Sequence, residues 1–126
     1  MLDSLLVVDS LTEGQEYLQL AVEIADDWIN HFVISSEKDD FAWYDMAVGQ
    51  RATKLSYMLR RLIEIHAPAD QIFRFILASE IHFSELLDEG RIAIHSNHGL
   101  FQMAGLISLC HNCLLYTSDA ADEEDS

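Results

Sequence analysis

Apolar residues recur at spacings of three and four along most of the chain, which is the period of an amphipathic helix. Residues 15–33 carry the stripe Leu18, Ala21, Val22, Ala25, Ile29 and Phe32. Residues 46–66 carry Val48, Ala52, Leu55, Leu59 and Leu62, with Lys54, Arg60, Arg61 and Glu64 on the opposite side. Residues 70–88 carry Ile72, Ile76, Ser79, Phe83 and Leu86. The pattern predicts an all-α chain of antiparallel helices over these three ranges.

The segment after Ser96 predicts a fourth helix, over residues 98–112, with a different pattern. From His98 to Cys110 it is apolar nearly all the way round. Such a helix is typically buried on most sides, at the centre of a larger assembly. Four helices with short loops fit an up-down bundle. A last helix that is buried all round fits a ring of paired helices better.

Composition narrows the class of protein. A chain of 126 residues, half of them hydrophobic and with a single proline, indicates one folded domain. The net charge of −15 argues against binding to nucleic acid or to an anionic membrane surface. No apolar run reaches the roughly 20 residues of a membrane span. Met1–Leu11 lacks a basic region, so we expect no signal peptide in it.

The residues from about Cys113 onward resemble a translated sequencing-library adapter. Cys113–Asp122 match one reading frame of a tagmentation adapter in order. We therefore expect residues 1–112 to form the domain and residues 113–126 to be an artefactual or disordered tail, with the natural chain continuing past Asn112. The alternative is an acidic C-terminal tail. Without residues 113–126 the net charge is −10, and all of it lies within the first 45 residues.

Ser96-Asn97-His98-Gly99, at the start of the last predicted helix, is the first candidate site. The unpaired N–H groups and the dipole make a helix N-terminus electropositive. The Asn97 amide and the His98 imidazole would add further donors at the same place, which suits a carboxylate or a phosphate. The alternative is that Asn97 only caps the helix and His98 is an ordinary residue of its first turn.

Trp43, Tyr44 and Arg51 form the second candidate site. The aromatic pair precedes the helix over 46–66, and Arg51 lies about 60° from the centre of its apolar stripe. Arg51 could therefore pair with Asp45 or reach an anionic ligand. The two rings could stack on a sugar or belong to the core.

We expect no metal and no cofactor. His95-x-x-His98 has no evident third ligand, and Cys110-x-x-Cys113 takes its second cysteine from the adapter-like tail. The chain also has no glycine-rich phosphate loop.

Two sequence motifs together resemble the N-terminal domain of heparinase II/III-like polysaccharide lyases, the group that includes alginate and heparin lyases. They are Trp43-Tyr-Asp-Met-Ala-Val-Gly-Gln-Arg51 and Ser96-Asn-His-Gly-Leu100, and Asp27-Trp28-Ile29 fits the same pattern. The resemblance covers about residues 14–112. It implies an incomplete α/α toroid of paired helices, followed by a β-sandwich domain that this chain would lack.

The resemblance also implies a reaction, β-elimination at a uronic acid of an anionic polysaccharide. A base removes the proton beside the carboxylate, an acid protonates the leaving oxygen, and the site neutralises the carboxylate as charge builds on it. In this family an Asn-His pair neutralises the carboxylate, and here the pair falls on Asn97 and His98. We assign Trp43, Tyr44, Arg51 and Gln102 to substrate binding.

The family's tyrosine acid and a further histidine come from later segments, so we expect this chain to be inactive without the missing C-terminal part. The parent protein would be periplasmic or secreted. The alternative function is a non-catalytic, acidic helical-bundle interaction module. A truncated toroid should leave an apolar patch on Leu100–Leu109, whereas a closed bundle should cover it.

Overall fold

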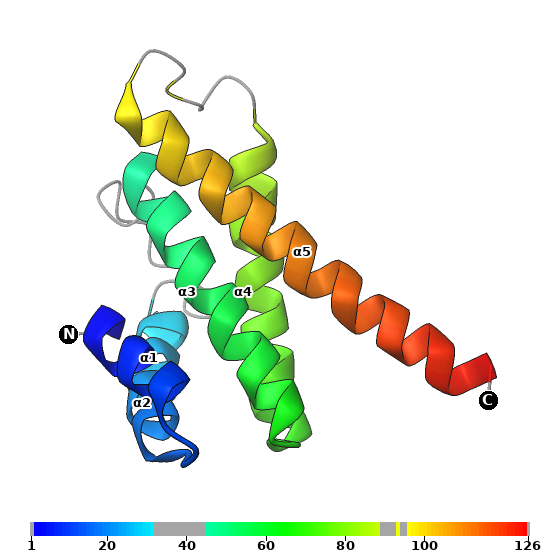
Figure 1. Cartoon of the computed structure of the whole chain (residues 1–126). Coiled ribbons are helices and arrows are strands. Elements are labelled where there is room, and N and C mark those ends of the chain that lie inside the picture. Colours follow the sequence, from blue (N-terminus) through cyan, green and yellow to red (C-terminus); the bar gives the residue numbers. More distant parts are fainter. Residues whose placement is uncertain (1, 32–44, 89–92, 94–95, 126) are drawn as a thin grey trace.

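The computed structural model describes residues 2–31, 45–88, 93 and 96–125. Over these ranges the chain forms helices and no strand, so the all-α prediction is confirmed (Figure 1). The helices are α1 (Leu2–Leu11), α2 (Glu16–Ile29), α3 (Asp45–Glu64), α4 (Ala69–Leu87) and α5 (Asn97–Asp125).

Two features depart from the expected helices. Helix α1 was not predicted, and it forms because Leu2, Leu5 and Leu6 lie on one face that packs on the core. Helix α5 runs to Asp125, past the predicted end at residue 112, and its C-terminal part extends away from α3 and α4 in Figure 1. The adapter origin of residues 113–126 stays a prediction.

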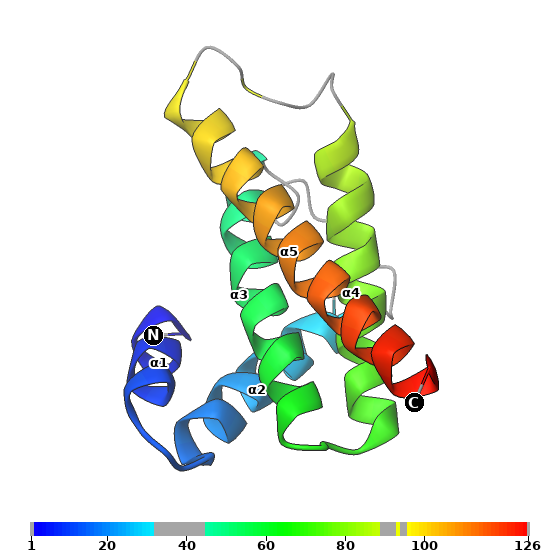
Figure 2. The same ribbon diagram turned by 45° about the vertical axis from the view of Figure 1, so that its right-hand side comes forward.

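Helices α3, α4 and α5 form the main body of the fold. Helix α4 runs antiparallel to both of its neighbours, while α3 and α5 run in the same direction (Figures 1 and 2). The tight turn between α3 and α4 is a Schellman motif, in which Ala67 N–H bonds to Leu62 C=O and His66 N–H bonds to Ile63 C=O. His66 holds the left-handed position of this motif, with φ 55°.

The predicted stripes of α2 and α3 are buried as expected. Phe32 alone lies outside the described residues. A first core cluster joins α1, α2, α3 and α4, and its buried members are Leu6, Leu18, Ala21, Val22, Ala25, Ile29, Leu55, Met58, Leu59, Leu62, Phe75 and Ala78. A second cluster joins α3, α4 and α5 and consists of Val48, Ala52, Leu86 and Leu109.

The buried face of α4 differs from the predicted stripe. Ser79 and Leu86 are buried, but Ile72, Ile76 and Phe83 are only half-buried. The other members of the buried face are Phe75, Ala78 and His82. The helix is rotated because Phe75 joins the first core cluster while His82 meets polar partners on α3.

Helices α3 and α5 cross with their backbones in contact. A Cβ at Gly49 would lie 2.5 Å from the carbonyl oxygen of Phe101, and one at Gly105 would collide with the carbonyl oxygen of Gly49. Only glycine permits this approach. Further along the same pair of helices, Asn112 Nδ2 donates to Ser56 Oγ at 2.6 Å. Glycines therefore let the two backbones touch, and the second cluster around Leu109 packs beside this crossing.

The outer face of α5 is apolar and exposed. Leu100 is 72% exposed and Ile107 is 63% exposed, with Met103 between them on the same face. In this chain the last helix is therefore not buried on most sides, and its exposed face is the apolar patch on Leu100–Leu109 that is expected of a truncated toroid. The reason is that α3 and α4 cover only the side that carries Gly105 and Leu109.

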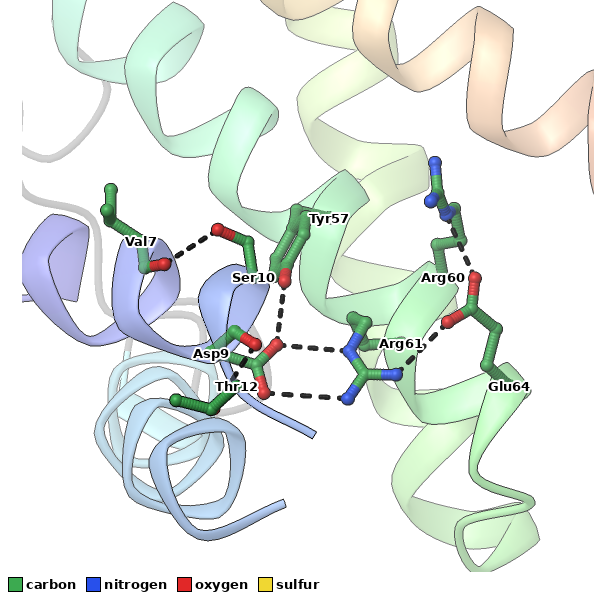
Figure 3. Close-up of polar contacts among 8 residues, drawn as sticks. All are labelled: Val7, Asp9, Ser10, Thr12, Tyr57, Arg60, Arg61 and Glu64. Atoms are coloured by element: carbon green, nitrogen blue, oxygen red, sulfur yellow. Dashed lines mark hydrogen bonds and ion pairs between the residues drawn. The ribbon is translucent and has the colours of Figure 1, made fainter. Parts of the chain in front are cut away.

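Helix α1 is fastened to α3 by a buried carboxylate (Figure 3). Asp9 Oδ2 accepts hydrogen bonds from the Tyr57 hydroxyl at 2.7 Å and from Arg61 Nε at 3.0 Å. The Asp9 side chain is fully buried, and Arg61 also donates to Glu64 at 3.1 Å. Desolvation and the bond to Asp9 raise the pKa of Tyr57 to about 12. Arg61, predicted to lie on the solvent side of α3, is thus part of the contact between α1 and α3.

Candidate functional site

The predicted anion site lies where α5 begins. The cap is Ser96, whose Oγ accepts the His98 N–H at 3.2 Å and whose carbonyl accepts the Gly99 N–H at 3.2 Å. The Asn97 side chain is exposed, and His98 is half-buried. Because the Ser96 side chain caps the helix, the Asn97 side-chain amide is not needed as the cap. It lies exposed beside the electropositive end of the helix.

Gln102 is one turn further into α5 and is buried, with 3% of its surface exposed. Its Oε1 accepts the backbone N–H of Ala93 at 2.9 Å. This contact ties the segment before α5 to the first turns of the helix. The buried Gln102 side chain thus holds the backbone at Ala93, and its assignment to substrate binding stays a prediction.

Arg51 lies at the centre of a polar cluster between α2, α3 and α4. Its Nε donates to His82 Nε2 at 2.8 Å, and its guanidinium lies 4.1 Å from the centroid of the Trp28 ring. The rings of Trp28 and His82 are 5.8 Å apart and inclined at 53°. A guanidinium placed over an indole face is stabilised by the quadrupole of the ring.

The hydrogen bonds of His82 fix its tautomer. Nδ1 lies 2.7 Å from the Ala78 carbonyl, which can only accept, so the proton is on Nδ1 and Nε2 accepts from Arg51. Burial, assisted by the Arg51 charge, lowers the pKa of His82 to about 3. Desolvation also lowers the pKa of Arg51, to about 10. At neutral pH the cluster is therefore a buried guanidinium cation held by a neutral imidazole.

The described contacts do not join Arg51 to Asn97 and His98. Gly49 faces α5, and Arg51, two residues later, is rotated by about 200° on the wheel of α3. Its described partners accordingly lie on α2 and α4. Trp43 and Tyr44 lie outside the described residues, so their predicted place beside Arg51 stays a prediction.

Sequence reasoning assigned no role to His82, and it used Trp28 only as part of a family pattern. A signal for His82 was present, because Phe75, Ala78, His82 and Leu86 are spaced by three and four residues. A histidine in a buried stripe needs polar partners, and Arg51 was the candidate on the flank of α3.

Within the described parts of the chain, no three histidine, cysteine, aspartate or glutamate side chains are grouped so as to hold a metal ion. Over the same residues, no helix is long and apolar enough to cross a membrane.

Comparisons with family models, with curated proteins and with solved structures gave no match to this chain.

Proposed function

We propose that this chain is part of the α/α toroid of a polysaccharide lyase, in which Asn97 and His98 neutralise the carboxylate of a uronic acid during β-elimination. The observation that carries the proposal is the start of α5. Ser96 caps the helix, so the exposed Asn97 amide stands beside the electropositive helix end. Hydrogen-bond donors fixed at such a point stabilise charge that builds up in a transition state.

The remaining residues have supporting roles in this proposal. Gln102 holds the backbone at Ala93 and so positions the approach to Asn97. Arg51, Trp43 and Tyr44 are assigned to binding of the anionic substrate. The described contacts hold the Arg51 guanidinium on His82 and Trp28, so its part in substrate binding rests on the resemblance and not on a contact with Asn97 or His98. In this proposal the general acid and base are not assigned to residues of this chain, and no metal or cofactor is assigned to the reaction.

The directions of the helices fit a toroid and an up-down bundle alike, because in both every second helix runs the same way, as α3 and α5 do (Figures 1 and 2). The exposed face of α5, with Leu100, Met103 and Ile107, is the surface on which the next helix of the ring would pack.

The second candidate function is a non-catalytic interaction module with an acidic N-terminal part. The exposed apolar face of α5 counts against it, because a closed bundle should cover that face. The behaviour of the full chain in solution separates the two candidates. A truncated toroid should melt over a broad range and bind a hydrophobic dye, whereas a sharp two-state melt without dye binding supports the module.

The test of the catalytic role is kinetic and uses a full-length parent enzyme. Replacing Asn97 removes a donor that acts mainly on the developing charge. Asn97→Ala should therefore lower kcat by roughly 10²–10³ and change KM less. Asn112→Ala is the matched control, because its amide bonds to Ser56 at the other end of the α3–α5 contact. Unchanged lyase activity in Asn97→Ala would refute the assigned role.

A further inference from the structure

A groove of about 390 Å³ lies between the first turns of α2 and the turn that joins α3 to α4. This turn is at the opposite end of α3 from the start of α5 (Figures 1 and 2). The volume is within the range of roughly 300–1,000 Å³ that small-molecule sites occupy. The groove is therefore a second place, separate from Asn97 and His98, at which the chain could hold a ligand.

The groove combines an apolar floor with a polar rim. The half-buried Ile65 and Ala67 and the exposed Pro68 supply the apolar surface within the groove, above the buried Leu18, Val22 and Leu62. The rim consists of Gln15, Gln19, Glu23, His66 and Gln71. Each of the three amides can both donate and accept, Glu23 accepts, and the imidazole can do either. Neither lysine nor arginine is among the residues that line the groove.

His66 is held in a conformation that suits glycine. It occupies the left-handed position of the Schellman motif with φ 55°, where a side chain costs conformational energy and glycine does not. The imidazole is nonetheless present there and lines the groove. Backbone strain of this kind is commonly retained where the side chain serves a site.

We propose that this groove binds a neutral, polyhydroxylated ligand of the size of a mono- or disaccharide. Sugar hydroxyls both donate and accept, which matches a rim of amides, one carboxylate and an imidazole. The C–H faces of a sugar ring fit an apolar floor. Because neither lysine nor arginine lines the groove, a phosphate or a uronate is a poorer match. The proposal does not depend on the proposed lyase function.

The test is an NMR titration of the full chain with cellobiose and glucose, compared with inorganic phosphate. We expect saturable shifts of the side-chain amides of Gln15, Gln19 and Gln71 with a sugar and none with phosphate. Shifts that do not saturate with either sugar, or that appear with phosphate instead, would overturn the proposal.

Two variants sharpen the result. His66→Gly should raise Tm by about 2–5 °C by removing the strain. It should also weaken sugar binding roughly three- to tenfold, the effect of one lost hydrogen bond. Gln50→Ala, on α3 near the opposite end, is the control and should bind as the unchanged chain does. Undiminished binding in both His66→Gly and Gln19→Ala would also contradict the proposal, since two rim residues would then be dispensable.

Discussion

Replacing Asp9 with alanine tests how α1 is held. The substitution removes the acceptor of the Tyr57 hydroxyl and of Arg61 Nε (Figure 3). Breaking a buried ion pair by deleting one partner costs roughly 3–5 kcal/mol. Arg61 keeps its bond to Glu64, and its side chain is 19% exposed, so water can reach it. We therefore expect the lower end of that range, about 3 kcal/mol.

Urea unfolding followed by helical circular dichroism measures this loss. With a slope of about 1.5 kcal/mol/M, a loss of about 3 kcal/mol moves the midpoint down by about 2 M. Asp3→Ala is the control, because Asp3 pairs with Lys54 at 3.2 Å but its side chain is 75% exposed. Exposed pairs contribute little, so its midpoint should hardly move.

A double substitution separates the effect of a buried charge left without its partner from the effect of lost packing. Arg61→Met combined with Asp9→Leu leaves no buried charge, and such replacements are often neutral in other proteins. The double variant should therefore be more stable than Asp9→Ala. If Asp9→Ala is no more harmful than Asp3→Ala, the polar cluster does not fasten α1 and our account of this helix is wrong.

Two further predictions concern pH and helix packing. Because the folded-state pKa of His82 is lowered to about 3 from 6.5, the unfolded chain binds a proton that the folded chain does not. Stability should therefore fall as pH drops below about 6.5, by roughly 2 kcal/mol at pH 5. Urea midpoints measured against pH check this, and His82→Gln should remove that part of the slope. Gly105→Ala should cost about 3 kcal/mol, since its Cβ meets the Gly49 backbone, whereas Gly14→Ala, with no atom within 4 Å, should be nearly neutral in the same assay.

Helical periodicity predicted the parts of the fold in which one apolar face decides the structure. All five residues of the α3 stripe are buried, from Val48 to Leu62. The spacing of Leu2, Leu5 and Leu6 is itself helical, so α1 was predictable as a helix. Its attachment to α3 was not, because it depends on Asp9 meeting Arg61, and these residues are 52 positions apart in sequence. A helical wheel of α3 places Arg61 toward solvent, because the wheel contains no information about contacts with another helix such as α1.

The candidate site was predictable only in its local part. The capped start of α5 follows from Ser96 and its neighbours, and the structure has the helix begin at Asn97. The Arg51 cluster depends on the rotation of α4, which brings His82 rather than Phe83 to the interior. That rotation is decided by packing among three helices, and no single stripe determines it.

The core is divided into two clusters, and local unfolding can separate one of them without the other. The first cluster joins α1, α2, α3 and α4, and it does not include α5. Helix α5 is held by the smaller cluster around Leu109 and by the glycine crossing with α3. Cooperative units of unequal stability open separately, and amide hydrogen exchange reports each opening. Asn97 belongs to the unit that holds α5 to α3 and α4, so its presentation depends on that unit staying closed and not on the first cluster.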